Sequence, residues 1–303
     1  ILFSPVNAIG HINSCVGVAE ILQSRGHRIV FMVNQSFKGA FIKRGFQEEI
    51  VEQEVNQEEN IEQVNKEQLD PSDYMLKVMK DCGLFDDLSP IEKHKRCAGL
   101  MESITKKEND TIDNIIKKIK PDVIVVDFLF APAIFIAGIP WVSLFSVQIL
   151  TAIDDPRTPP GWSGLPIYDN SEWKNYREKA NGHIEQAKKK LFYLFEEKGL
   201  KPFPDGRWIE SPYLNIYAYP KELDYLDQRP LPPKWHQFDS FIRLNEQDFE
   251  LPEKLKQKNG NLIFLSLGSL GSSNVQLMKR LVNLIADLPF RFIVAKGIFG
   301  DQY

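Results

Sequence analysis

The strongest constraint on the fold is a helical pattern between two continuous apolar runs near the start of the chain. The runs ILFSPV (residues 1–6) and RIVFMVN (residues 28–34) have the apolar content of buried strands. Between them, Val16, Ala19, Ile21 and Leu22 recur at near-helical spacing, and the pattern ends at Gly26, a residue that suits a helix terminus. Apolar strands that alternate with helices predict a parallel sheet covered on both faces.

The same alternation continues along the chain. Residues 121–127 (PDVIVVD), 138–146 and 214–219 read as strands, and an amphipathic helix precedes the first of them, with an apolar stripe at Ile104, Ile112, Ile115, Ile116 and Ile119. The Glu- and Gln-rich residues 48–68 predict a solvated loop or a frayed helix. The proline-rich stretch 154–166 predicts a long loop of the kind that is often functional or mobile.

A strand–helix–strand pattern begins again after Gly260, with LIFLSLGS and RFIVAKG as its strands. Proline and charge dominate residues 229–260, which read as a passage between domains. We therefore expect an α/β protein with an N-terminal α/β domain at 1–240, a linker at 241–260 and the beginning of a second α/β domain at 261–303.

Charge and composition exclude several partners. A net charge of -4 gives no reason to expect nucleic acid or an anionic membrane, and no stretch approaches the ~20 apolar residues of a membrane span. Three cysteines without metal-type spacing suggest free thiols in a reducing compartment. The chain starts inside a predicted strand and stops abruptly at Tyr303, so we expect a fragment that is truncated at both ends.

Three polar residues lie at the carboxyl ends of predicted strands or just beyond them, where open α/β sheets bind their ligands. They are His11, Asp127 and Ser269. A carboxylate beside an imidazole fixes its tautomer and suits a general base that removes a proton from a hydroxyl. The alternatives are structural: His11 could pack at the helix start, Asp127 could be an N-cap, and SLGSLGSSN could be a flexible turn rather than a phosphate-binding loop.

Motifs along nearly the whole chain resemble the UDP-glycosyltransferase superfamily (family 1, GT-B) in its mite and spider-mite form. They include GHINS, PDVIVVDFLFAPAI, GIPWV, DDPRTPPGWSGLP, LNIYAYPKELDYLDQRPLPPKW and LIFLSLGSLGSS. The resemblance implies two facing Rossmann-like domains, with acceptors bound mainly by the first and the UDP-sugar mainly by the second. The chain stops before the family's C-terminal Trp-x-Pro-Gln to His-x-x-x-Gly segment, so it is expected to hold only the first loop of the donor site.

The resemblance also implies an enzyme, a hexosyltransferase that inverts the anomeric carbon without a metal or cofactor. His11 falls on the family's catalytic base, Asp127 on its partner, and Gly268 and Ser269 on the loop that binds the donor diphosphate. UDP-glucose is the expected donor. The expected acceptor is a small lipophilic molecule, as in the family's detoxification role.

The acceptor site and the wider function leave alternatives. Phe128, Phe130, Phe145 and Gln148 lie near the expected site and could line an acceptor pocket, or the aromatic residues could simply be core. A catalytically inactive homologue that binds lipophilic molecules and a GT-B nucleotide-sugar epimerase are the competing functions. A cytoplasmic location is favoured by the Gly-His turn, and the endoplasmic reticulum membrane is the alternative if the missing termini carry a signal peptide and an anchor.

Overall fold

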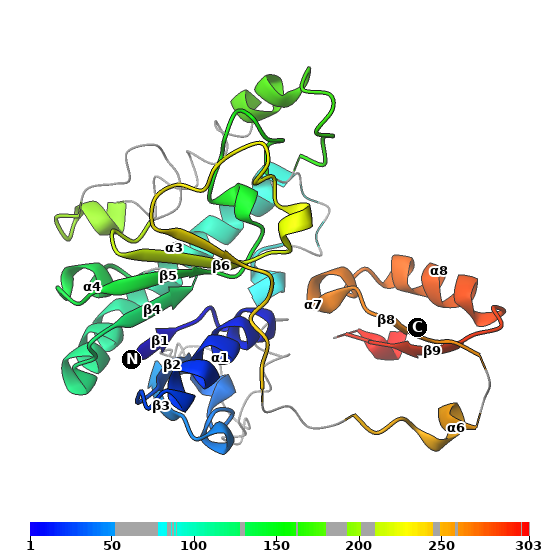
Figure 1. The fold of residues 1–303 in the computed structure, drawn as a ribbon, viewed down its shortest axis with the longest axis horizontal. Helices are drawn as coiled ribbons and strands as arrows, with labels where there is room; N and C mark the ends of the chain where they lie inside the picture. Colours follow the sequence, from blue (N-terminus) through cyan, green and yellow to red (C-terminus); the bar gives the residue numbers. More distant parts are fainter. Residues whose placement is uncertain are drawn as a thin grey trace. The chain divides into compact units, whose positions relative to one another are not determined.

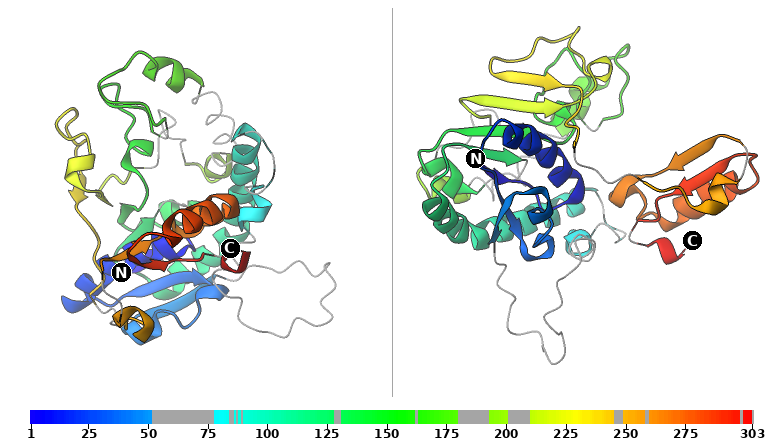
Figure 2. Two further views of the ribbon diagram at one scale, coloured as in Figure 1. Left: turned by 90° about the vertical axis from the view of Figure 1, so that its right-hand side faces the viewer. Right: turned by 60° about the horizontal axis from the view of Figure 1, so that its bottom comes forward.

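The chain divides into two compact units, Ile1–Asn245 and Glu246–Tyr303, in a computed structural model. The structure describes residues 1–51, 78–83, 86, 88, 90–127, 131–161, 163–179, 193–200, 210–244, 249–257, 260–297 and 299–302. The first unit runs from blue to yellow and the second from orange to red (Figures 1 and 2). The boundary between the units falls inside the stretch 241–260 that was expected to link two domains.

The first unit is built on one seven-stranded sheet, in which every neighbouring pair of strands is parallel. Its order is β3-β2-β1-β4-β5-β6-β7. The strands are β1 (Leu2–Ser4), β2 (Val30–Asn34), β3 (Gln47–Val51), β4 (Ile124–Asp127), β5 (Trp141–Phe145), β6 (Leu214–Ala218) and β7 (Trp235–Phe238). The chain adds strands to one side of β1 and then returns to its other side with β4, so the order reverses between β1 and β4.

Helices cover both faces of this sheet, as Figure 1 shows. They are α1 (Ile9–Ser24), α3 (Pro90–Ile119) and α4 (Pro132–Ile136), with short 3-10 turns η1 (Gln35–Phe37), η2 (Ile42–Arg44), η3 (Ile149–Thr151) and η4 (Lys221–Leu223). Gly26, just beyond α1, has a positive φ of 89°, which suits the predicted end of that helix.

Alternation along the strands divides the core into two layers. Leu2, Ile124 and Val126 pack with α3 and α4, whereas Phe3 and Val125 pack with α1. Successive side chains of a strand point to opposite faces of its sheet, so this is the pattern of a sheet buried on both sides. Each fully buried large apolar side chain contributes roughly 1.5–3 kcal/mol relative to its exposed state.

Two predicted features of the first unit differ from the structure. The beginning of the polar segment 48–68 belongs to β3, and the proline-rich passage 229–260 contains β7. These are the two edge strands of the sheet, where charged and polar residues are normal because one side of the strand has no partner. The rest of the polar segment, residues 52–68, lies outside the described residues.

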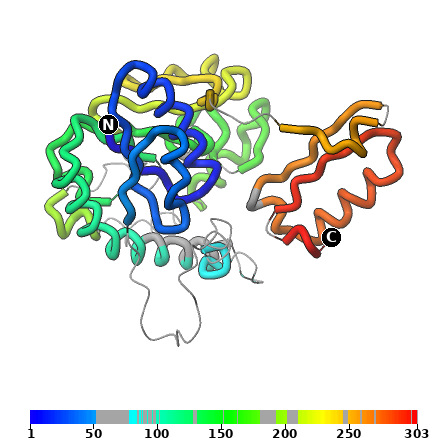
Figure 3. The backbone as a smooth tube through the Cα atoms, turned by 90° about the horizontal axis from the view of Figure 1, so that it is seen from below, coloured from blue at the N-terminus to red at the C-terminus, as the bar shows by residue number. Residues whose placement is uncertain are grey.

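The second unit has a two-stranded parallel sheet of β8 (Leu262–Leu265) and β9 (Arg291–Val294), joined through α8 (Val275–Ala286). The remaining helical elements are α6 (Glu253–Lys256), α7 (Gly268–Gly271) and η5 (Gly300–Gln302). Figure 3 traces this strand–helix–strand course in orange and red. The predicted pattern after Gly260 is therefore present.

Candidate active site

His11 lies in the first turn of α1, immediately after the turn that leaves β1. The helix begins at Ile9. The N-cap is Ala8, whose side chain forms no capping hydrogen bond. The turn is anchored instead by Asn7, whose Oδ1 accepts a hydrogen bond from the backbone N–H of Asn34 at the end of β2 (2.9 Å).

Asp127 is the last residue of β4, and its side chain is 0% exposed. It is two residues beyond Val125, so strand alternation directs it to the face of the sheet that α1 covers. His11 Nδ1 lies 2.7 Å from Asp127 Oδ2. The hydrogen bond between these two residues, which their places in the sequence made possible, is therefore present.

Ser146 completes the arrangement, and sequence reasoning missed it. The Ser146 hydroxyl donates a hydrogen bond to Asp127 Oδ1 (2.7 Å). The Ser146 hydroxyl oxygen also lies 2.6 Å from His11 Nδ1. The residue directly follows β5 and is two residues beyond Leu144, which packs against α1. Alternation along the predicted strand 138–146 could have revealed it, because Leu144 and Ser146 fall on one face.

The geometry fixes what the histidine ring can do. A carboxylate oxygen can only accept a hydrogen bond, so the contact with Asp127 assigns the proton to Nδ1 and the lone pair to Nε2. The imidazole is partly accessible, since 22% of the His11 side-chain surface is exposed. A ring held in this way has a basic nitrogen that can take a proton from a hydroxyl.

Buried surroundings also determine the chemistry of Cys15, one turn along α1 from His11. Its thiol is fully buried. Burial, reinforced by the negative charge of Asp127, raises the pKa of the Cys15 thiol well above its usual range. The thiol therefore stays protonated, and Cys15 packs in the core as an apolar side chain would.

The other predicted site residues are less informative. Phe145 is 1% exposed and packs in the core with Trp235, so its aromatic ring has no surface for an acceptor here, contrary to the pocket hypothesis. Gln148 is half-buried and precedes η3. Phe128 and Phe130 lie outside the described residues, as does the side chain of Ser269. Gly268 begins α7 with a φ of 65°.

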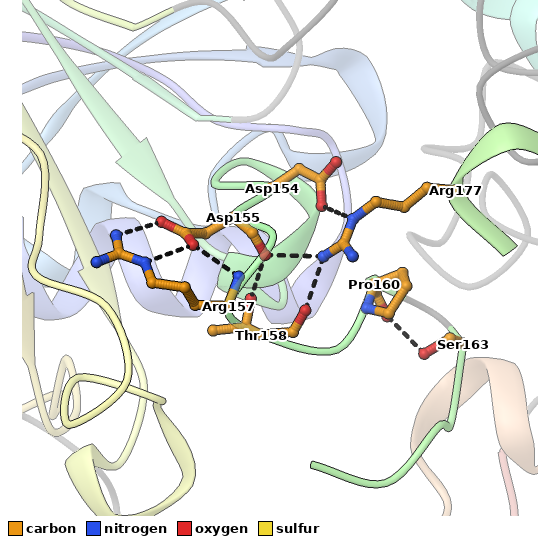
Figure 4. Close-up of polar contacts among 7 residues, drawn as sticks. All are labelled: Asp154, Asp155, Arg157, Thr158, Pro160, Ser163 and Arg177. Carbon is orange, nitrogen blue, oxygen red and sulfur yellow. Dashed lines mark hydrogen bonds and ion pairs between the residues drawn. The ribbon is translucent and has the colours of Figure 1, made fainter. Parts of the chain in front are cut away.

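The proline-rich stretch 154–166 is tied together by arginines, as Figure 4 shows. Arg177 donates to Asp154 Oδ1 (2.7 Å) and to the backbone carbonyls of Asp155 (2.8 Å) and Thr158 (2.7 Å). The hydrogen bonds from Arg157 lower the pKa of the Asp155 carboxyl to about 2. This stretch was expected to be a functional or mobile loop, and these bonds restrain the part around Asp155.

Residues 241–244, expected to be the start of the linker, pack on α1. Leu244 N–H donates to Glu20 Oε2 (2.5 Å), and Arg243 Nη1 donates to Asn13 Oδ1 (2.6 Å). A Cβ at Gly17 would lie 2.5 Å from the backbone oxygen of Phe241, so only glycine allows this approach. The segment 241–244 therefore belongs to the first unit and lies along the helix that carries His11.

No helix in the described ranges is both long and apolar enough to cross a bilayer. Within the same ranges, no three His, Cys, Asp or Glu residues form a group that could hold a metal ion.

Solved glycosyltransferases resemble the whole chain. A glycotransferase of kitacinnamycin matches with a TM-score of 0.61 at 14% identity, over 98% of this chain and 65% of that one. SsfS6 from Streptomyces sp. SF2575, complexed with thymidine diphosphate, matches with a TM-score of 0.57 at 14% identity, over 97% and 67%. The spinosyn rhamnosyltransferase SpnG matches with a TM-score of 0.57 at 12% identity, over 97% and 64%.

Sequence comparisons add nothing to this result. No protein-family model matches the chain, and no curated protein sequence does. The chain spans about 65% of the length of the first of these glycosyltransferases. At these sequence identities the similarity establishes the fold alone. The chain has the mixed α/β architecture of the GT-B glycosyltransferase fold.

Proposed function

We propose that the chain belongs to an inverting glycosyltransferase that moves glucose from UDP-glucose to a hydroxyl of a small lipophilic acceptor. One observation carries the proposal. A partly accessible histidine is held by a buried aspartate at the carboxyl edge of the parallel sheet. The sheet order reverses at that edge, between β1 and β4, and ligands of open α/β sheets bind at such points.

In the proposed reaction, His11 Nε2 takes the proton of the acceptor hydroxyl. The acceptor oxygen then forms a bond to the anomeric carbon, while the bond from that carbon to the diphosphate oxygen breaks and its electron pair leaves with UDP. Asp127 stabilises the imidazolium that forms, because its carboxylate lies 2.7 Å from Nδ1. Neither a metal nor a cofactor takes part in this proposal.

The position of Ser146 argues against a hydrolase, an enzyme class in which serine, histidine and aspartate form a catalytic triad. In a hydrolase triad the serine and the aspartate bind opposite nitrogens of the ring. Here both lie at Nδ1, and the serine proton goes to the aspartate. His11 Nε2 is therefore not placed to activate Ser146 as a nucleophile.

The proposal also assigns a donor site and an acceptor site. For the donor, we assign the diphosphate to Gly268 and Ser269 in the second unit, on the sequence resemblance; two of the related structures were solved with thymidine diphosphate. For the acceptor, we retain Phe128, Phe130 and Gln148 and omit Phe145, which is buried. A detoxifying enzyme of the mite type is the corresponding biological role.

The test uses the full-length protein with UDP-glucose and a simple phenol, and measures the glucoside by mass spectrometry. His11→Ala is expected to abolish transfer, and Asp127→Asn to reduce it strongly. His27→Ala is the matched control, because this exposed histidine lies just beyond the other end of α1. Thymidine and uridine donors are compared in the same assay.

Each outcome decides between functions. Near-normal transfer by His11→Ala would refute the general-base role. Tight binding of lipophilic molecules with no transfer by the native protein would favour the inactive binding homologue. Conversion of the UDP-sugar into its epimer without any acceptor would favour the epimerase.

A further inference from the structure

Ser146 makes two contacts that together restrict the protonation of His11. Its hydroxyl proton is used on Asp127 Oδ1, so its oxygen can only accept from His11 Nδ1. Two accepting oxygens thus face the same nitrogen, at 2.6 and 2.7 Å. If the proton moved to Nε2, the Nδ1 lone pair would face both oxygens without a hydrogen between them. That tautomer is disfavoured by both contacts.

The serine also restrains the carboxylate. Asp127 Oδ2 contacts the histidine and Oδ1 accepts from Ser146, so the two bonds define the plane of the carboxylate. The serine directly follows β5, which pairs with β4, the strand that carries the aspartate. The restraint therefore comes from residues at the ends of two paired strands of one sheet, Asp127 as the last residue of β4 and Ser146 directly after β5.

We infer that Ser146 is a positioning residue, which holds His11 as the Nδ1–H tautomer and so keeps the lone pair on Nε2. The inference rests on the proposed function for its catalytic meaning. Its structural content, a closed ring of hydrogen bonds among three side chains, stands without it. Asp127 supplies one acceptor for the hydrogen on His11 Nδ1. Ser146 supplies a second acceptor for that hydrogen, and its own hydrogen bond fixes the orientation of the Asp127 carboxylate.

The experiment measures the tautomer directly, without substrate, by nitrogen NMR of the five histidine rings in the ¹⁵N-labelled protein. The spectrum of His11→Gln identifies the His11 signals. In the native protein at a pH where the ring is neutral, Nδ1 is expected to be protonated and Nε2 to be unprotonated. Ser146→Ala is expected to give a mixture of both tautomers, and Ser146→Thr, which keeps the hydroxyl, is expected to restore the native pattern.

Ser143→Ala is the matched control, because it removes a buried hydroxyl from β5 itself and is expected to leave the His11 tautomer unchanged. A single Nδ1–H tautomer in folded Ser146→Ala would overturn the inference. So would an Nε2–H tautomer in the native protein, a result that needs no variant to fold.

Activity is measured in parallel on the full-length protein. Loss of one hydrogen bond to a charged group predicts that kcat of Ser146→Ala falls by about 10- to 100-fold, with KM little changed and with recovery in Ser146→Thr. If the tautomer shifts in Ser146→Ala but His11→Ala still transfers sugar, the proposed function fails and the positioning role stands. If the tautomer does not shift, the positioning role fails whatever the activity.

Discussion

Replacement of Gly17 by alanine tests whether residues 241–244 are held on α1. In most helix interiors this change stabilises the protein by about 1 kcal/mol, because alanine has the higher helix propensity. Here the new Cβ would lie 2.5 Å from the backbone oxygen and 2.8 Å from the carbonyl carbon of Phe241. Both are backbone atoms that no side-chain rotation can move, so the backbones of the segment and of the helix must move apart, which we expect to break the hydrogen bonds between them.

The cost follows from the bonds that hold the segment. Leu244 N–H donates to Glu20, a carboxylate whose residue is 3% exposed, and Arg243 donates to Asn13. Hydrogen bonds with a charged partner contribute roughly 1.5–3 kcal/mol each, and the helix gain offsets about 1 kcal/mol of their sum. Glu20 keeps its ion pair with Arg44 (2.6 Å). We therefore expect Gly17→Ala to lower the free energy of unfolding by about 2–5 kcal/mol.

Thermal unfolding and limited trypsin digestion measure this effect. A loss of about 3 kcal/mol corresponds to a fall in Tm of roughly 6–12 °C for a unit of this size. Released from the helix, the chain should also be cut faster after Arg243. Gly99→Ala in α3 is the control, since a Cβ there meets nothing within 4 Å, and it should raise stability by roughly 0.5–1 kcal/mol. A rise in Tm for Gly17→Ala, matching that of Gly99→Ala, would refute the reasoning.

Three further predictions concern buried or paired titratable groups. Arg229, whose guanidinium is fully buried, pairs with Asp224 (2.8 Å), so Arg229→Leu should cost about 3–5 kcal/mol in urea unfolding, and adding Asp224→Asn should restore much of the loss. Because the pKa of Cys15 is raised by burial, iodoacetamide at about pH 8.5 should modify this thiol only after denaturation; rapid labelling of the native protein would contradict it. The pKa of Asp155 is lowered to about 2, chiefly by its hydrogen bonds with Arg157, so its stabilising effect is present above about pH 4 and is lost as the pH falls toward 2; Asp155→Asn should flatten that part of the stability–pH curve.

Most of the sheet was predictable because its central strands are apolar on both faces. The sequences of β1, β2, β4 and β5 are nearly continuous apolar runs, and such runs are typical of parallel strands that are buried on both faces. The edge strands were missed because their sequences are not continuously apolar. β3 reads QEEIV and β7 reads WHQF, and a strand with one unpaired side can carry such polar residues.

The site was predictable in part. His11 and Asp127 could be paired because one follows a predicted strand and the other is the last residue of one, and such strand ends lie at one edge of a parallel sheet. Ser146 needed knowledge of which side chains of β5 share a face with Asp127, and that depends on the order of β4 and β5 in the sheet. Close approaches such as that of Phe241 to Gly17 involve backbone atoms far apart in the chain, and no local pattern encodes them.

The central place of β1 has a consequence for synthesis of the protein. The contact between His11 and Asp127 joins residues that are 116 positions apart, and that between His11 and Ser146 joins residues 135 apart. At about 5–20 residues per second, a ribosome makes Asp127 roughly 6–23 s after His11. During that interval β1 can pair only with β2, and its other edge awaits β4. A nascent chain that ends before residue 146 therefore contains His11 without the complete set of residues that holds its ring.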